Sequence, residues 1–179
     1  MDLPPLIPVH QRLVDQHITD VPGEVRRQLA AAGLAQRVKP GSRIAVTAGS
    51  RGIANIAAIV GAVVEELKSA GALPFVVPAM GSHGGATAEG QRAVLAEYGI
   101  SKESMGCPIL SDMSPVPLGR TPSGAAVFMD RNAHDADGVL VVARVKPHTS
   151  FRSPVESGLC KMMAVGLGKQ LGAESMHQH

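Results

Sequence analysis

The apolar positions of this chain fall into runs of two lengths, separated by turns that contain glycine and proline. Three short runs have the length of buried strands: residues 43–47 (RIAVT), 74–78 (PFVVP) and 138–143 (GVLVVA). Two longer stretches have helical spacing, and each is closed by a glycine: residues 53–70 before Gly71, and residues 87–98 before Gly99. Strands that alternate with helices predict an α/β fold, in which Rossmann-like layers place helices on both faces of a parallel sheet.

Shorter elements flank this pattern. Residues 20–36 predict an N-terminal helix that Asp20 can cap. Residues 107–110 and 125–130 predict two further short strands, and the intervening residues 111–124 predict a run of turns. No internal repeat interrupts the order, so we expect the chain to form a single domain over residues 1–179.

Composition narrows the class of protein. Of the 179 residues 45% are apolar, which suits a globular domain, but only four are aromatic. The net charge is +2 and no block of lysine or arginine occurs, so we expect no nucleic-acid binding. No apolar run is long enough to cross a membrane, and the proline-rich segment 3–8 predicts an extended strap along the surface rather than a signal peptide. Two cysteines make no disulfide framework, so we expect a cytoplasmic protein with free thiols.

Reactive side chains follow each of the three predicted parallel strands. Ser50 and Arg51 come after the first strand, His83 after the second, and Lys146 and His148 after the third. In parallel sheets ligands bind outside the carboxyl ends of the strands. We therefore expect these loops to open on one edge of the sheet and His83 and His148 to face one cleft.

Each of these loops has a functional and a purely structural interpretation. In GSHGGAT (81–87), glycines on both sides of His83 let the backbone approach a ligand, and an imidazole exchanges protons near neutral pH. The alternative is a glycine-rich turn that caps the next helix. Pro147 stiffens the third loop and presents His148, which could instead be a structural histidine. The turn at Arg51 could hold an anion at the start of a helix or simply expose an arginine to solvent.

The segment 145–177 mixes reactive and apolar residues in an unusual way. It contains Lys161 within the run LCKMM, and it ends in His177. A lysine in an apolar run either reaches to the surface or is used as an amine nucleophile. Cys160 is expected to be a small packed residue, because no CxxC or HExxH pattern supports a zinc site.

Several of these segments together resemble the nickel-dependent lactate racemase family, through its N-terminal, cofactor-binding domain. The resemblance rests on MGSHGGAT (80–87), VKPHTSF (145–151) and ESGLCKMMAVGLGKQLGAESMH (156–177), and AGSRGIAN (48–55) supports it. It implies an isomerase, a racemase or epimerase of a small 2-hydroxy acid. It also implies a nickel-pincer nucleotide, a pyridinium mononucleotide tethered to a lysine, as the cofactor that exchanges a hydride with C2 of the substrate.

The resemblance also implies roles for single residues. His83 and His148 are the expected acid/base pair, Lys161 the tether and His177 the nickel ligand. Ser50 and Arg51, in the loop after the first strand, are expected to bind the cofactor or the substrate. Imidazole suits nickel, and an apolar shell around the tether is expected to keep water away from the reaction.

Some features depart from the family pattern. Lys169, in GLGKQ, is a rival tether, because the interval from His148 to Lys161 is longer than in lactate racemase. Ala48-Gly-Ser stands where the racemase has an acidic residue. Family members carry a second domain that closes the site, so we interpret this chain as a fragment that alone has little or no activity and can form homo-oligomers.

Two other functions stay open from the sequence. One is a non-catalytic α/β module that binds a nucleotide or an anionic metabolite. The other, weaker, is a scaffold for a partner protein.

Overall fold

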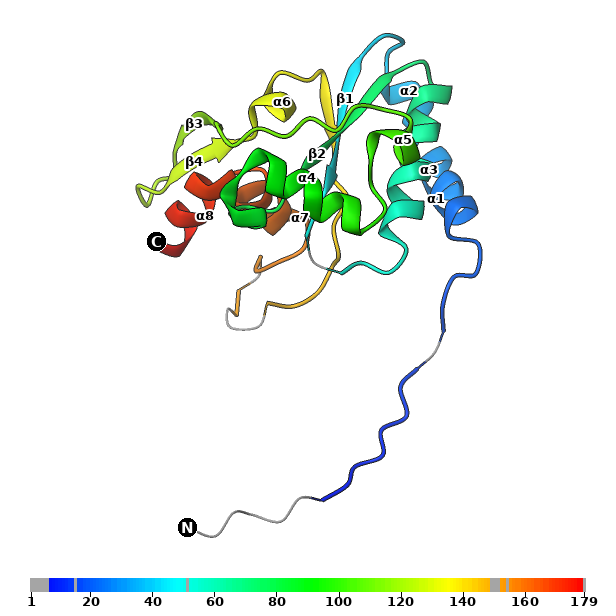
Figure 1. The fold of residues 1–179 in the computed structure, drawn as a ribbon, viewed down its shortest axis with the longest axis horizontal. Coiled ribbons are helices and arrows are strands. Elements are labelled where there is room, and N and C mark those ends of the chain that lie inside the picture. Colours follow the sequence, from blue (N-terminus) through cyan, green and yellow to red (C-terminus); the bar gives the residue numbers. More distant parts are fainter. Residues whose placement is uncertain (1–6, 15, 51, 149–151, 154, 179) are drawn as a thin grey trace.

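A three-stranded parallel sheet forms the centre of the molecule. The computed structural model describes residues 7–14, 16–50, 52–148, 152–153 and 155–178. The strands are β1 (Arg43–Ala48), β2 (Leu73–Pro78) and β5 (Gly138–Leu140), and they lie in the order β2–β1–β5 (Figure 1). β1 is parallel to both of its neighbours. The predicted α/β class and the parallel sheet are therefore confirmed.

One face of the sheet packs against helices α3 (Ile56–Ser69) and α4 (Ala88–Glu97). The buried cluster there joins aliphatic side chains of β1, β2 and both helices, among them Val46 and Leu95. Buried positions recur along α3 at intervals of one helical turn: Ile56, Val60, Val63, Val64 and Leu67. The two predicted helices thus form, each somewhat shorter than expected.

A smaller cluster covers the opposite face. Phe75 and Val77 of β2 lie there with Ala133 of helix α6 (Arg131–His134) and with Leu167. Leu167 follows the short helix α7 (Leu159–Lys161) and the π-helical turn η2 (Met162–Gly166), and it precedes helix α8 (Lys169–Gln178). Helical elements therefore lie on both faces, as the apolar pattern predicted.

The N-terminal helical region is split into α1 (Val21–Ala31) and α2 (Leu34–Arg37). Asp20 caps α1, because its Oδ1 accepts a hydrogen bond of 2.9 Å from the backbone N–H of Gly23. The predicted single helix is interrupted at Gly33, whose φ of 71° lies in the left-handed region.

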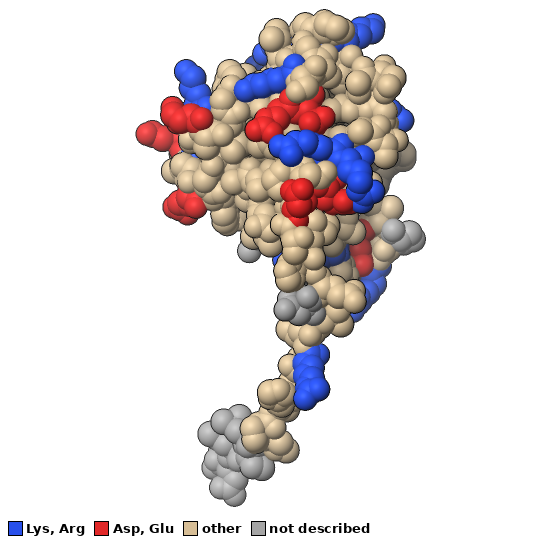
Figure 2. All heavy atoms as spheres, turned by 90° about the vertical axis from the view of Figure 1, so that its right-hand side faces the viewer, with Lys and Arg blue, Asp and Glu red and all other residues tan. Residues whose placement is uncertain are grey.

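Charges of both signs lie side by side on the face that includes α1 (Figure 2). Arg26 of α1 pairs with Glu65 at 3.0 Å and lies near Glu66 of α3. Arg27 pairs with Glu24 along the helix. These exposed pairs place charges of opposite sign next to each other on that face.

The prediction for the middle of the chain is partly wrong. Residues expected to be turns contain β3 (Val116–Arg120), which pairs antiparallel with β4 (Ala126–Met129) in a separate hairpin. β4 therefore lies outside the parallel sheet. The prolines and glycines of this region favoured a prediction of turns, but the edge strand of a hairpin tolerates these residues. Helix α8 packs on the hairpin, and the hydroxyl of Ser175 donates to the carbonyl of Ala126 at 2.7 Å.

The predicted strand at 107–110 reduces to one parallel bridge between Val76 and Ile109. The backbone N–H of Val76 donates to Pro108, and that of Leu110 donates back to Val76. Helix η1 (Gly84–Ala86) follows β2, and α5 (Lys102–Met105) leads into this edge segment.

β5 is shorter and less buried than predicted. Its three residues are half-buried, because it lies at an edge of the described sheet. The side chain of Thr47 extends the pairing, since its Oγ1 accepts from the N–H of Val142 at 2.9 Å and lies 3.3 Å from the carbonyl oxygen of that residue.

Two other expectations are wrong. Residues 7–8, the described part of the expected surface strap, belong to an exposed arm that runs away from the domain (Figure 1). Cys160 is exposed, whereas Cys107 is buried. Among the described helices, none combines the length and the apolar character needed to cross a membrane.

Candidate active site

The loops that follow β1, β2 and β5 meet at the carboxyl edge of the sheet. The loops after β1 and β2 are joined by a hydrogen bond between Ser50 Oγ and His83 Nδ1. The loops after β5 and β1 approach through Arg144, whose Nη1 lies 3.5 Å from the carbonyl oxygen of Gly52. The sheet order makes this convergence possible, because β1 lies between the other two strands. Arg51, one of the predicted site residues, lies outside the described residues.

The contact between Ser50 and His83 fixes one nitrogen of the imidazole. His83 is exposed, and Nδ1 is turned toward the serine hydroxyl. Tyr98 contacts the backbone of the same serine, because its hydroxyl donates to the carbonyl oxygen of Ser50 at 2.8 Å. An imidazole held in this way can exchange protons near neutral pH. Ser50 was predicted to bind the cofactor, and in the structure it touches the predicted acid/base residue.

The loop that carries His83 depends on its glycines. Gly81, Gly84 and Gly85 all have φ between 61° and 67°, a conformation that favours glycine. A Cβ at Gly84 would lie 2.6 Å from the backbone carbon of Gly90, so the loop sits directly on the first turn of α4. Thr87 caps that helix by accepting from the N–H of Gly90 at 3.0 Å. The predicted capping role of this turn is thus present beside the exposed histidine.

A buried polar network lies beneath this loop. The amine of Lys169 is completely buried and contacts three acceptors: the carbonyl of Pro78 at 2.6 Å, Oε1 of Gln91 at 3.0 Å and Oδ2 of Asp130 at 2.9 Å. Burial lowers the pKa of Lys169, and the negative charge of Asp130 opposes this shift. Asp130 also caps α6, because its Oδ1 accepts from the N–H of Ala133.

Gln91 connects the network to the histidine loop. Its Nε2 donates to the carbonyl of Gly81 at 2.8 Å and lies 3.2 Å from that of His83. The sequence did not lead us to predict Gln91 or Asp130 as part of the site, although its pattern contained one indication for Gln91. Gln91 stands four residues before Leu95, on the face of α4 that is buried, and a polar residue on the core side of a helix requires partners.

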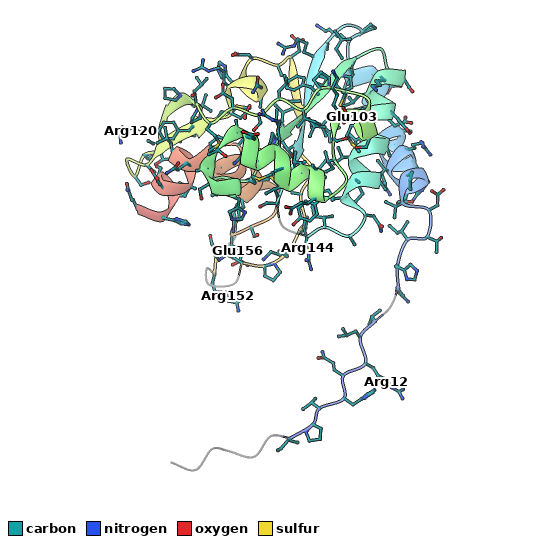
Figure 3. All side chains as sticks on the ribbon, viewed as in Figure 1. Arg12, Glu103, Arg120, Arg144, Arg152 and Glu156 are labelled. Carbon is teal, nitrogen blue, oxygen red and sulfur yellow. The ribbon has the colours of Figure 1, made fainter. Side chains whose placement is uncertain are left out.

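The loop after β5 brings positive charge and His148 to the same edge. Arg144, Arg152 and Glu156 all lie on this segment, below the rest of the domain in the view of Figure 3. His148 is half-buried and Lys146 is exposed. Oε2 of Glu156 is buried, and none of the described residues donates a hydrogen bond to it. Cationic side chains in this position suit a carboxylate or phosphate ligand.

The two candidate lysines differ in their surroundings. Lys161 ends α7 and is exposed, so the apolar shell predicted around it is absent. The apolar and buried surroundings belong to Lys169 instead. The run LCKMM winds into a helix and the π-helical turn, which turns Lys161 to the surface while Met162 packs toward the sheet.

The glycines between these lysines serve close packing. A Cβ at Gly166 would lie 2.7 Å from the carbonyl oxygen of Ala79, and the N–H of Gly81 donates to the carbonyl of Gly166 at 3.2 Å. The end of β2 and the π-helical turn are therefore in backbone contact. This contact brings the segment that carries Lys161 beside the segment that carries His83.

His177 lies in the last turn of α8 and is exposed. Among the residues that the structure describes, no group of three or more His, Cys, Asp or Glu side chains could hold a metal ion.

Comparison with known protein families assigns the chain to one of them. The family model described as lactate racemase N-terminal domain matches residues 11–153. The chain belongs to this family. A comparison with curated proteins found no match.

The lactate racemase match covers only part of the candidate site. It includes Ser50, His83 and His148, and it ends before Lys161 and His177. The first three residues thus lie within the family domain, whereas the tether and metal roles depend on the motif in the segment that follows.

Proposed function

We propose that this chain forms the catalytic and cofactor-binding part of a racemase or epimerase that acts on a small 2-hydroxy acid. The observation that carries the proposal is the joining of His83 and Ser50 at the carboxyl edge of the sheet, next to the loop of His148. Membership of the lactate racemase family agrees with this chemistry. The finer assignments below extend beyond the family match.

The proposed proton transfers use the two histidines. In the proposed reaction the C2 hydrogen would leave as a hydride and the hydroxyl would lose its proton, which would leave a flat 2-keto acid. His83 and His148 would exchange the hydroxyl proton from two loops, so that either enantiomer meets a base. Arg144 and Lys146 would hold the substrate carboxylate and fix its orientation.

The residues present fit a lysine-tethered cofactor. Lys161 has an exposed amine, whereas the amine of Lys169 is buried and engaged with three acceptors. We therefore assign the tether to Lys161 rather than Lys169, and a single metal-ligand role to His177. When bound, a nickel-pincer nucleotide would supply the group that takes the hydride from C2 and gives it back.

The test is mass spectrometry on the chain produced together with the enzymes that make the cofactor. We expect a covalent adduct on the peptide containing Lys161, bound nickel by elemental analysis, and no adduct in the variant Lys161→Arg. The matched control is Lys102→Arg, which changes another exposed lysine. If Lys161 stays unmodified and no nickel is bound, the assignment is wrong, and a module that only binds an anionic metabolite becomes the better explanation.

A further inference from the structure

Lys169 combines two unfavourable features. Its amine is completely buried, which is costly for an ionisable group. Its backbone has φ of 55°, in the left-handed region that side chains rarely occupy. Such costs persist only when the surroundings impose them, and they concentrate at functional positions. In the proposed function Lys169 has no role as a tether, so its conformation needs another explanation.

The amine of Lys169 donates hydrogen bonds to two acceptors and forms an ion pair with a third group. An ammonium group has three donors and no acceptor. The three partners belong to three different elements: the end of β2 at Pro78, α4 at Gln91 and the N-terminus of α6 at Asp130. Lys169 therefore ties together the elements that surround the histidine loop.

Contact with Lys169 also determines how the amide of Gln91 is turned. Because Lys169 can only donate, Gln91 must present Oε1 to it. Nε2 then faces the carbonyl oxygens of Gly81 and His83. A flipped amide would place an oxygen against these two oxygens and an N–H against the ammonium group. Only one orientation of Gln91 is therefore compatible with both neighbours.

We propose that Lys169 is a positioning residue that holds the His83 loop in place through the oriented amide of Gln91. The connection runs from Lys169 to Gln91 and from Gln91 to the backbone of Gly81 and His83. Its consequence for catalysis rests on the proposed racemase function, but its structural effect does not.

The most direct test is Gln91→Glu. This substitution keeps the size of the side chain and an acceptor for Lys169, but it removes both donors to the loop. Gln170→Glu is the matched control, because Gln170 is exposed on α8 and its Nε2 donates to Glu174 instead. A second test is the double variant Lys169→Met/Asp130→Asn. It removes the orienting ammonium group, leaves no unpaired charge, and preserves an oxygen that can cap α6.

The readouts are amide hydrogen exchange of residues 81–86 and the ¹⁵N shifts of the His83 ring in the folded protein. We expect exchange of these amides to rise about tenfold or more in Gln91→Glu and in the double variant, with loss of a single His83 tautomer. Gln170→Glu should change neither. Unchanged loop exchange and an unchanged tautomer in a folded Gln91→Glu or double variant would overturn the proposal.

Activity separates this inference from the proposed function. In the cofactor-loaded protein we expect both variants to lower kcat much more than they change KM, because the loop is misplaced while the substrate-binding cations remain. Another outcome is that the cofactor-loaded protein without substitutions shows no racemase activity while the variants still change the exchange of the loop. In that case the positioning role stands and the proposed reaction is wrong.

Discussion

Ser50 and His83 are 33 residues apart in the chain, yet the hydroxyl of one is hydrogen-bonded to Nδ1 of the other. The contact exists because β1 and β2 are adjacent and parallel, so their following loops leave the sheet at the same edge. It holds one nitrogen of the His83 imidazole against the hydroxyl of Ser50, so we expect the serine to fix the orientation of the ring.

Replacing Ser50 with alanine should impair proton transfer by His83. Without the hydroxyl, the ring loses the partner that fixes its orientation, and we expect kcat of the loaded enzyme to fall about 10-fold to 100-fold with a smaller change in KM. Steady-state kinetics in both directions would measure this. Ser82→Ala is the control, because Ser82 is an exposed neighbour of His83. Equal losses in the two variants would argue against a specific role for Ser50.

Tyr98 should contribute to stability through its bond to the Ser50 carbonyl. Tyr98→Phe removes only the hydroxyl that donates to this oxygen at 2.8 Å. We expect the free energy of unfolding to fall by about 1 kcal/mol, the usual net contribution of such a bond. Urea denaturation would measure it. An unchanged midpoint would show that water replaces the tyrosine hydroxyl at no cost.

The packing of α3 against the sheet should dominate stability. Leu67 is fully buried in the main cluster, so Leu67→Ala should lower the free energy of unfolding by about 2–5 kcal/mol. Leu73 is 59% exposed, and Leu73→Ala should change it by no more than about 0.5 kcal/mol. Thermal and chemical denaturation of the two variants would compare them directly. Similar losses at both positions would contradict the described burial.

The buried amine of Lys169 should make stability depend on alkaline pH. Burial lowers the pKa of Lys169 below its ordinary value of 10.5. As pH rises between the lowered pKa and 10.5, the unfolded chain holds a proton that the folded chain has released. This difference makes the Lys169 contribution to the free energy of unfolding increase with pH in that interval.

Cys107 acts in the opposite direction, because burial raises the pKa of its thiol above 9.0. In the unfolded chain the thiol loses its proton first, so its contribution favours unfolding as pH rises. Cys107 is present both in the original chain and in the double variant Lys169→Met/Asp130→Asn. Its contribution therefore cancels when the free energies of unfolding of the two proteins are compared. We expect the stability of the original chain to rise relative to the double variant as pH increases toward 10.5. A difference that is constant with pH would contradict the lowered pKa of Lys169.

The sequence by itself was sufficient for the α/β class, the central strands, the main helices and the cap at Asp20. These features depend on local spacing and local hydrogen bonds, which a chain of residues displays directly. The same spacing predicted that Ser50, His83 and His148 follow parallel strands. The family resemblance rested on sequence motifs instead, and the match over residues 11–153 confirmed it.

Only the tertiary structure decided how the two lysines differ. Lys161 and Lys169 both stand in apolar, glycine-rich sequence, but the helical turns between them leave the first exposed and bury the second against Pro78, Gln91 and Asp130. The partners of Lys169 are 39 to 91 residues away in the chain. Contacts over such separations depend on how the sheet and its helices pack, so no local pattern distinguishes an exposed amine from one that is buried among polar partners.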